Sequence, residues 1–326
     1  MSSALLAFPV IDGYAALRRR MERWQDESSE SRAMARIWPE IIGTLHLLQA
    51  RLPSAEWAAL RGQLRGSELA SLVLEDPMTR WSWERPRGQR ADAGLIDMVY
   101  GHASQAPRIA AASRLGRQMH RAVFALPSLA AMRARVAGFR RLIEQSLARQ
   151  GETQVLSIGA GHLRSAEGWE PNQLPTRWVA TEQDRLAIPV LAGQEGIEAE
   201  HLSIGGFIRR PARLGRFDLV TCGGVTDLMN ERDAARLVAA GYAALRPGGR
   251  VVFASTARPL PDRAYLDVFM DWHPGWRDEA AVDRLLAATP SLGGARGRHR
   301  RKAQGDLLFT EVTKPARSTQ PRRRAA

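Results

Sequence analysis

Cysteine is almost absent from this chain of 326 residues, since Cys222 is the only one. A single thiol excludes an intrachain disulfide and any metal site built from several thiolates. The seven histidines are scattered, with no pair at i, i+4 beside a carboxylate, so no metal site is expected.

Long apolar runs are also missing, because none approaches the roughly 18 residues needed to cross a bilayer. The apolar stretch at 4–10 is short and contains Pro9. The arginines at 18–20 follow it rather than precede it, unlike in a secretory signal. The sequence therefore predicts a cytoplasmic protein without a membrane span, and it is compatible with a homodimer.

Lysine is nearly absent too: only Lys302 and Lys314 are lysines among 47 basic residues, so 45 are arginines. A net charge of +13 suits a nucleic-acid partner. However, most arginines are spread along the chain, as on a solvated surface, and the dense basic stretches lie only at 296–302 and 322–324. We expect a basic tail that is disordered from Pro315 onward, and nucleic acid as an unlikely partner. The alternative, a nucleic-acid-binding protein, predicts salt-dependent binding that is lost on deleting 316–326.

The first 150 residues have a helical pattern. Apolar residues recur at helical spacing over 54–74 and over 127–149, where Met132, Val136, Phe139, Ile143 and Leu147 form one stripe. Between these helices, residues 76–92 are polar and rich in Trp and Arg, which indicates a loop. We therefore expect an all-helical N-terminal domain over 1–150, which caps the site or binds substrate.

From residue 151 short β-prone runs alternate with helical ones, which is typical of a parallel sheet with helices on both faces. The expected strands are 154–158, 178–181, 217–222 and 250–255, with a helix at 231–245 and a late edge strand at 309–312. The prediction is an α/β chain with a Rossmann-like domain over 151–315, mainly parallel in its sheet, and a tail over 316–326.

A glycine turn, Gly159-Ala160-Gly161, directly follows the first predicted strand. Glycines there let the backbone pass close to a ligand, and the N–H groups that follow are free to bind it. The third glycine of a dinucleotide-binding fingerprint is replaced by Arg164. This argues against NAD and is compatible with S-adenosylmethionine (SAM), which has no pyrophosphate.

Two further signals support SAM. The second strand ends in Glu182-Gln183-Asp184, and an acidic side chain at that tip can accept both ribose hydroxyls. Glu182 is the first choice, and Asp184 is the second or a helix cap. The third signal is Pro247-Gly248-Gly249 directly before the strand at 250–255.

With those residues in place, the chain resembles the class I SAM-dependent methyltransferases of the bacterial extracellular factor (3-hydroxypalmitic acid methyl ester) biosynthesis family. The resemblance covers most of 75–315. Besides the glycine turn, it is carried by the blocks 76–79, 85–88, 92–101, 217–220, 224–228, 271–272 and 276–277.

The resemblance implies a set of cofactor-binding residues. Ser157, Gly159 and Gly161 would line the methionine and ribose, Glu182 the ribose, Gly206 and Phe207 the adenine, and 221–223 the sulfonium. The full predicted set is Ser157, Gly159, Ala160, Gly161, Glu182, Gln183, Gly206, Phe207, Thr221, Cys222 and Gly223. The sequence departs from the family at 221–224, where Thr-Cys-Gly-Gly replaces Tyr-Ser-Ala-Gly, and at 273–277.

The predicted function is methyl transfer to a small molecule, with a carboxylate as the favoured acceptor, either hydroxy-fatty-acid-like or a biosynthetic intermediate of secondary metabolism. A carboxylate is already ionised at neutral pH, so it needs no base, and Arg85, Arg87 or Arg277 could clamp it. Trp276 could face the sulfonium.

The alternative reading keeps the fold and the cofactor. A SAM cyclase would release methylthioadenosine and a cyclic amino acid such as azetidine-2-carboxylate. It would need a group near the amine, for which Asp92, Asp97, Tyr100 or Asn230 are candidates.

Overall fold

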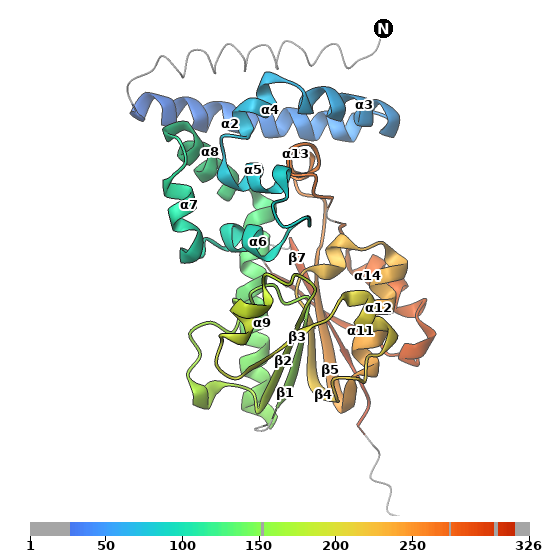
Figure 1. Ribbon diagram of the computed structural model, residues 1–326. Coiled ribbons are helices and arrows are strands. Elements are labelled where there is room, and N and C mark those ends of the chain that lie inside the picture. Colours follow the sequence, from blue (N-terminus) through green and yellow to red (C-terminus); the bar gives the residue numbers. More distant parts are fainter. Residues whose placement is uncertain (1–26, 151–152, 274, 303–305, 317–326) are drawn as a thin grey trace, which may run out of the picture. The chain divides into compact units, whose positions relative to one another are not determined.

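Seven strands form one sheet in the computed structural model, which describes residues 27–150, 153–273, 275–302 and 306–316 (Figure 1). The strands are β1 (Gln154–Ile158), β2 (Arg177–Glu182), β3 (Ile197–His201), β4 (Phe217–Cys222), β5 (Leu245–Thr256), β6 (Gly297–Lys302) and β7 (Leu307–Thr313). Their order is β3-β2-β1-β4-β5-β7-β6. The first five are parallel, whereas β7 runs antiparallel to β5, and β6 antiparallel to β7. This confirms the predicted Rossmann-like fold with a mainly parallel sheet.

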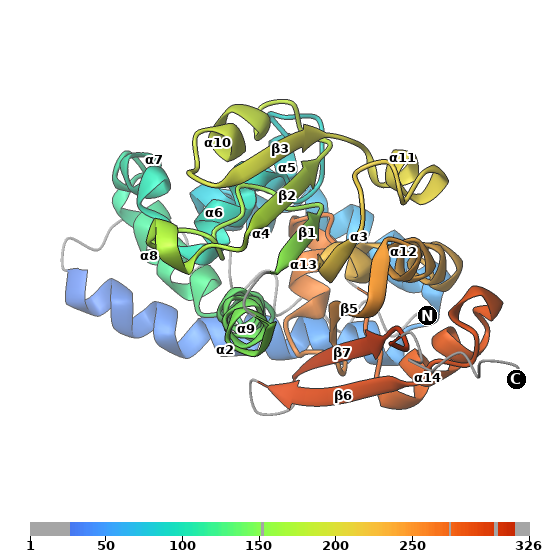
Figure 2. The same ribbon diagram turned by 90° about the horizontal axis from the view of Figure 1, so that it is seen from below.

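Helices cover both faces of this sheet (Figure 2). On one face α9 (Pro127–Gln150) packs Phe139, Leu142 and Ile143 against β1, β2 and β5. On the other face lie α12 (Glu231–Ala243) and α14 (Glu279–Ala287). The remaining helices of this unit are α10 (Ile188–Ala192) and α11 (Ile204–Arg209), with short 3-10 turns η3 (Pro171–Gln173), η4 (Val225–Leu228) and η5 (Pro290–Leu292).

The strand at the sheet's edge differs from the prediction. Residues 309–312 lie in β7, which is flanked by β5 and β6, so they do not form an edge. The edge strand on this side of the sheet is β6. It holds much of the basic stretch at 296–302, including Arg298, Arg300, Arg301 and Lys302. Charged side chains on an edge strand discourage pairing with other chains. The basic residues at 322–324 lie outside the described residues, as does the apolar stretch at 4–10.

A second compact unit is helical. It contains α2 (Glu27–Arg51), α3 (Ser54–Arg65), α4 (Glu68–Val73), α5 (Pro77–Glu84), α6 (Ala93–Tyr100), η2 (Ala103–Gln105), α7 (Ala106–Ala110), α8 (Arg114–Phe124) and α13 (Arg263–Phe269). Contacts assign it the described residues up to Arg133 together with 259–273. Residues 134–150 therefore group with the sheet, not with the helical unit as the expected boundary at 150 implied, because α9 contributes to the sheet's core.

Two local predictions in this unit were wrong. The segment 54–74 forms two helices, because α3 ends at Gly66 and α4 begins after Ser67. The segment 76–92 is not all loop, since α5 begins at Pro77. The carboxylate of Asp76 caps α5 by accepting the N–H groups of Met78 at 3.3 Å and Thr79 at 2.7 Å.

Helix α13 lies at the centre of the helical unit's core. Its residues Tyr265, Leu266, Val268 and Phe269 are buried together with side chains of α2 to α6 and α8. The ring of Trp38 meets that of Tyr265 edge-on, with centroids 5.2 Å apart. A segment far along the chain thus completes the N-terminal helical bundle.

Within the described residues, no helix taken by itself combines the length and apolar character needed to cross a bilayer. Helices α8 and α9 pass that test only as a pair, which is bent by 65° at the break between them.

Candidate functional site

The glycine turn follows β1 at the carboxyl end of the sheet. Gly159 and Gly161 have φ angles of +60° and +57°, which side chains rarely tolerate. A Cβ atom on Gly159 would lie 2.4 Å from Cγ2 of Val225, in the loop after β4. The N–H of Ala160 donates to the carbonyl of Thr181 at 3.0 Å, which ties the turn to β2. The turn therefore needs glycine both for its conformation and for space.

Glu182 lies at the tip of β2 and is buried, with 8% of the residue exposed. One oxygen accepts the N–H of Gly161 at 2.8 Å, and the other accepts those of Gln183 and Asp184 at 2.7 and 2.9 Å. Three backbone donors thus fix the orientation of this carboxylate, while the oxygen bound to Gly161 keeps acceptor capacity for a hydroxyl. Asp184 is buried and accepts the N–H of Leu186 at 3.0 Å, as a turn residue does.

Ser157 and Thr221 face one another on β1 and β4, with 3.0 Å between their hydroxyl oxygens. The indole N–H of Trp178 also donates to Ser157, at 3.0 Å. Cys222, next to Thr221, is fully buried, and burial raises the pKa of its thiol to about 12. It is therefore an uncharged filler of the core and not a nucleophile.

The predicted adenine residues lie in α11. Gly206 is in its first turn, where its N–H donates to the Ser203 cap at 3.1 Å. The ring of Phe207 is fully buried in the core between the sheet, α11 and α12, where it is not available to a ligand. Any contact of Phe207 with adenine would thus involve its backbone. The carbonyl of Gln183 lies 3.2 Å from Nε2 of His201 on β3.

Two predicted catalytic residues also lie in the sheet unit. The side chain of Asn230 caps α12 by accepting the N–H of Asp233 at 2.9 Å, which is a structural role. Trp276 is 43% exposed and pairs with Thr256 at the carboxyl end of β5. Both residues are exposed to solvent, and of the two only Asn230 caps a helix.

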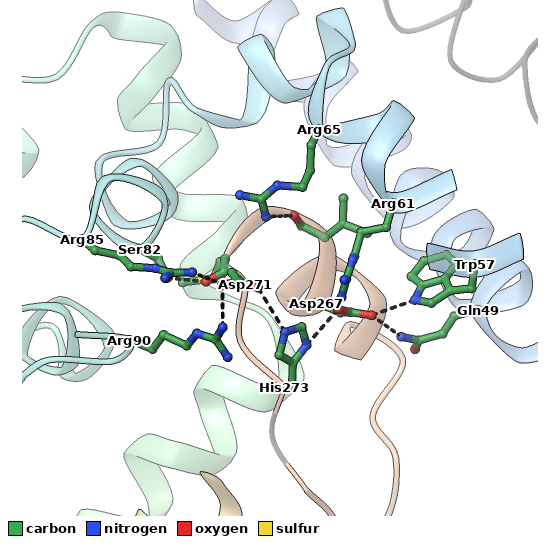
Figure 3. A network of polar contacts seen from close by, with 12 residues as sticks. Gln49, Trp57, Arg61, Arg65, Ser82, Arg85, Arg90, Asp267, Asp271 and His273 are labelled. Atoms are coloured by element: carbon green, nitrogen blue, oxygen red, sulfur yellow. Dashed lines mark hydrogen bonds and ion pairs between the residues drawn. The ribbon is translucent and has the colours of Figure 1, made fainter. Parts of the chain in front are cut away.

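The other four are in the helical unit. Arg85, the left-handed C-cap of α5, forms an ion pair with Asp271, which Arg90 also approaches (Figure 3). Arg87 lies 3.8 Å from Asp92. Asp92 caps α6 and accepts the indole N–H of Trp81 at 2.8 Å. Tyr100, at the end of α6, packs partly buried against the helical core. Both arginines therefore already face carboxylates, and Asp92 holds a helix terminus.

Sequence reasoning missed a buried charged cluster beside the β4 end of the site. Asp227, 4% exposed, accepts from Nη2 of Arg135 at 2.7 Å and from the hydroxyl of Thr256 at 3.2 Å. Burial raises the pKa of Asp227, and the nearby Arg135 and Arg277 offset part of that rise. A signal was present: Arg135 lies four residues before Phe139, on the buried face of α9, where an arginine needs a partner.

No protein-family model matches the sequence, and comparison with curated proteins gives no match. Among solved structures the chain is similar to a possible exported protein from Bordetella parapertussis, with a TM-score of 0.55 and 20% identity over 90% of this chain and 98% of that one. It is also similar to an O-methyltransferase family protein from Burkholderia thailandensis, with a TM-score of 0.45 and 12% identity over 66% and 64% of the two chains.

A third similar structure is the N-methyltransferase NodS from Bradyrhizobium japonicum WM9 in complex with S-adenosylhomocysteine (SAH), with a TM-score of 0.40 and 17% identity over 56% of this chain and 88% of that one. At these identities the likeness shows the fold alone.

Proposed function

We propose that the sheet unit binds SAM and that the protein is a SAM-dependent methyltransferase acting on a small molecule, with a carboxylate as the favoured acceptor. The observation that carries the proposal is the pairing of the Gly159–Gly161 turn with the Glu182 carboxylate. They are joined by the 2.8 Å hydrogen bond from Gly161.

The residues at this end of the sheet fit an adenosyl ligand. The positive-φ glycines leave no side chain between the turn and a ligand, and the orientation of Glu182 is fixed by three backbone donors. A fixed carboxylate suits the two hydroxyls of a ribose. The turn has no third glycine for a pyrophosphate, which favours SAM over a dinucleotide.

SAM, when bound, supplies a methyl group on a sulfonium, which leaves as a neutral thioether. The chain has to hold donor and acceptor in line, so positioning provides much of the rate. For the acceptor carboxylate we propose Arg85 and Arg87, because a guanidinium can bind a carboxylate through two parallel hydrogen bonds. Each would have to exchange the carboxylate that it now faces, Asp271 or Asp92, for that of the acceptor. No proton has to be removed from such an acceptor, so no base is required.

Calorimetry with SAH and SAM tests cofactor binding, with NADH as the control ligand. We expect heat with the first two and none with NADH. Absence of heat with both SAH and SAM for folded protein would overturn the proposal.

Mass spectrometry then tests the reaction. Incubation with SAM and a panel of carboxylic acids, including 3-hydroxy fatty acids, should give SAH and a methyl ester only when an acceptor is present. Methylthioadenosine formed from SAM alone would instead identify the cyclase alternative.

A further inference from the structure

The loop after β4 is held by three segments that are distant in sequence. Arg135 of α9 and Thr256 of β5 both donate to the carboxylate of Asp227. The third segment is 275–277. From it, Gly275 donates its N–H to the carbonyl of Asp227 at 2.6 Å.

Arg277 completes this support. Its guanidinium donates to the carbonyls of Thr226 at 2.8 Å and Met229 at 2.7 Å, on either side of Asp227. Its own N–H donates to the carbonyl of Thr256 at 2.8 Å. The carbonyl groups of a 3-10 turn, which water would otherwise solvate, are thus bound by a buried arginine.

The same loop touches the glycine turn. Val225 fills the space beside Gly159, and a Cβ atom on Gly224 would lie 2.4 Å from Nη1 of Arg135. Arg135 therefore packs against the loop at Gly224, and Val225 of the same loop packs against the glycine turn. Arg135 and the glycine turn thus contact the same loop.

Stability alone does not explain this arrangement. A buried ion pair adds little net stability over well-packed apolar residues, because desolvation of both charges offsets their attraction. Here the second oxygen of Asp227 and Nε of both Arg135 and Arg277 are buried without a hydrogen-bond partner among the described residues. Buried polar atoms without partners lower the stability of the folded protein. The reason for the cluster is therefore the position in which it holds the loop, because apolar residues would not fix that position.

We propose that Arg135 and Asp227 are positioning residues of the cofactor site, which hold the loop 224–228 against the glycine turn. The inference rests on the proposed function, because it assigns these residues to SAM binding. They act through Val225 and Gly224 and need not touch the ligand.

The test compares two buried arginines. Arg135 lies on α9 and binds the loop after β4, whereas Arg250 lies on β5 and contacts Ser146 of α9. Arg250 is 9% exposed. It lies at the amino end of the part of β5 that pairs in parallel with β4 from Leu219 onward. It donates to Glu311 at 2.9 Å and contacts the hydroxyl of Ser146 on α9, far along the strands from the β4 loop. Arg135→Met and the matched control Arg250→Met therefore remove the same charge from opposite ends of one sheet.

We expect both variants to lower the midpoint of thermal unfolding, but only Arg135→Met to weaken SAH binding in calorimetry. The expected loss is about tenfold, the size of effect that a residue acting through a neighbouring contact produces. Asp227→Asn, which keeps the side chain's shape, should show the same loss, and Arg135→Lys should restore part of it.

Three results separate the possibilities. Equal SAH affinity in wild type, Arg135→Met and Asp227→Asn overturns the inference and leaves the proposed function standing. Equal losses in Arg135→Met and Arg250→Met also overturn it, because the effect is then general destabilisation. No heat with wild-type protein overturns the proposed function and the inference with it. If Arg135→Met does not fold, Asp227→Asn decides.

Discussion

Gly161 donates its backbone N–H to the carboxylate of Glu182 at 2.8 Å, so the tip of β2 and the turn after β1 are fixed to one another. This single bond joins the two sequence signals that were 21 residues apart. Glu182 thus has a structural role, as acceptor for backbone N–H groups, besides the role that we propose for it in binding a ribose.

We predict that Glu182→Gln weakens adenosine binding by about tenfold or more, because a hydrogen bond to a charged acceptor contributes about 1.5–3 kcal/mol. The same variant should bind 2′,3′-dideoxyadenosine as weakly as wild type does, since that ligand lacks the hydroxyls. Calorimetry with both ligands checks this. Asp184→Asn, which changes the adjacent buried carboxylate, is the control and should bind adenosine normally.

Gly159→Ala should both destabilise the protein and weaken SAH binding. A left-handed conformation costs a residue with a Cβ about 1–2 kcal/mol, and the new methyl would also collide with Val225, at 2.4 Å. Overpacking adds about 1–3 kcal/mol.

Gly168→Ala is the matched control, because Gly168 has a φ of +70° with nothing within 4 Å of its added Cβ. It should show only the conformational cost in urea unfolding. Equal losses of the free energy of unfolding in the two variants would contradict the prediction, because Val225 would then move aside at no cost.

Asp76 should be among the most sensitive positions of the helical unit. Its carboxylate caps α5, accepts from the hydroxyl of Thr79 at 2.7 Å and pairs with His120 at 2.8 Å, and all three residues are buried. We predict that Asp76→Ala lowers the free energy of unfolding by about 3 kcal/mol or more, as expected when one member of a buried network is removed.

The control is Asp278→Ala. Asp278 caps α14 through one bond, from the N–H of Ala281 at 2.8 Å, and is only partly buried. Loss of an ordinary cap costs about 1 kcal/mol. Chemical unfolding of both variants measures the difference, and a similar small loss at both positions would contradict the prediction.

His273 should make the stability of the helical unit depend on pH. Its ring lies between Asp267 at 2.8 Å and Asp271 at 3.1 Å (Figure 3). Burial nevertheless lowers its pKa below the ordinary 6.5. Arg61 and Arg90 lower it further, whereas Asp267 opposes the shift. The unfolded chain therefore takes up a proton at a higher pH than the folded chain does, so stability falls as the pH drops below about 6.5.

We predict that His273→Gln flattens this dependence, so that its stability relative to wild type improves between pH 7.5 and pH 5. Urea unfolding at several pH values checks this. If the stability of His273→Gln relative to wild type instead worsens between pH 7.5 and pH 5, then Asp267 and Asp271 stabilise the protonated ring by more than burial destabilises it.

The sheet and the helical character of the N-terminal region were largely predictable from the sequence, whereas the division of that region into helices was not. The strand at 217–222 was placed correctly because a run of apolar residues between turn signals leaves little choice. The segment 76–92 was mistaken for a loop because its polar composition hid a cap and a proline, Asp76-Pro77, that together start a helix. No local pattern indicates that α13 belongs to the N-terminal bundle, since only three-dimensional packing brings Tyr265 beside Trp38.

For the candidate site, glycine spacing and the position of Glu182 after a strand were readable because backbone conformation imposes them. In the cluster around Asp227 only Arg135 had such a signal, as an arginine on the buried face of a helix. Its other members, Thr256 and Arg277, come from segments with no shared periodicity. Asn230 and Asp92 were chosen for their chemistry, yet both serve as caps, a use that their places before helices also indicate.

The late position of α13 in the chain bears on how the molecule emerges from the ribosome. The N-terminal helices are synthesised first, but the residues that fill their centre, including Tyr265, Leu266 and Phe269, follow only after β5 has been made. The early helices must wait, with apolar surface uncovered, until more than a hundred further residues have been added. Truncation near residue 133 would leave α13 in the C-terminal fragment and remove it from the helical unit, so a single cut in the chain cannot separate the two units.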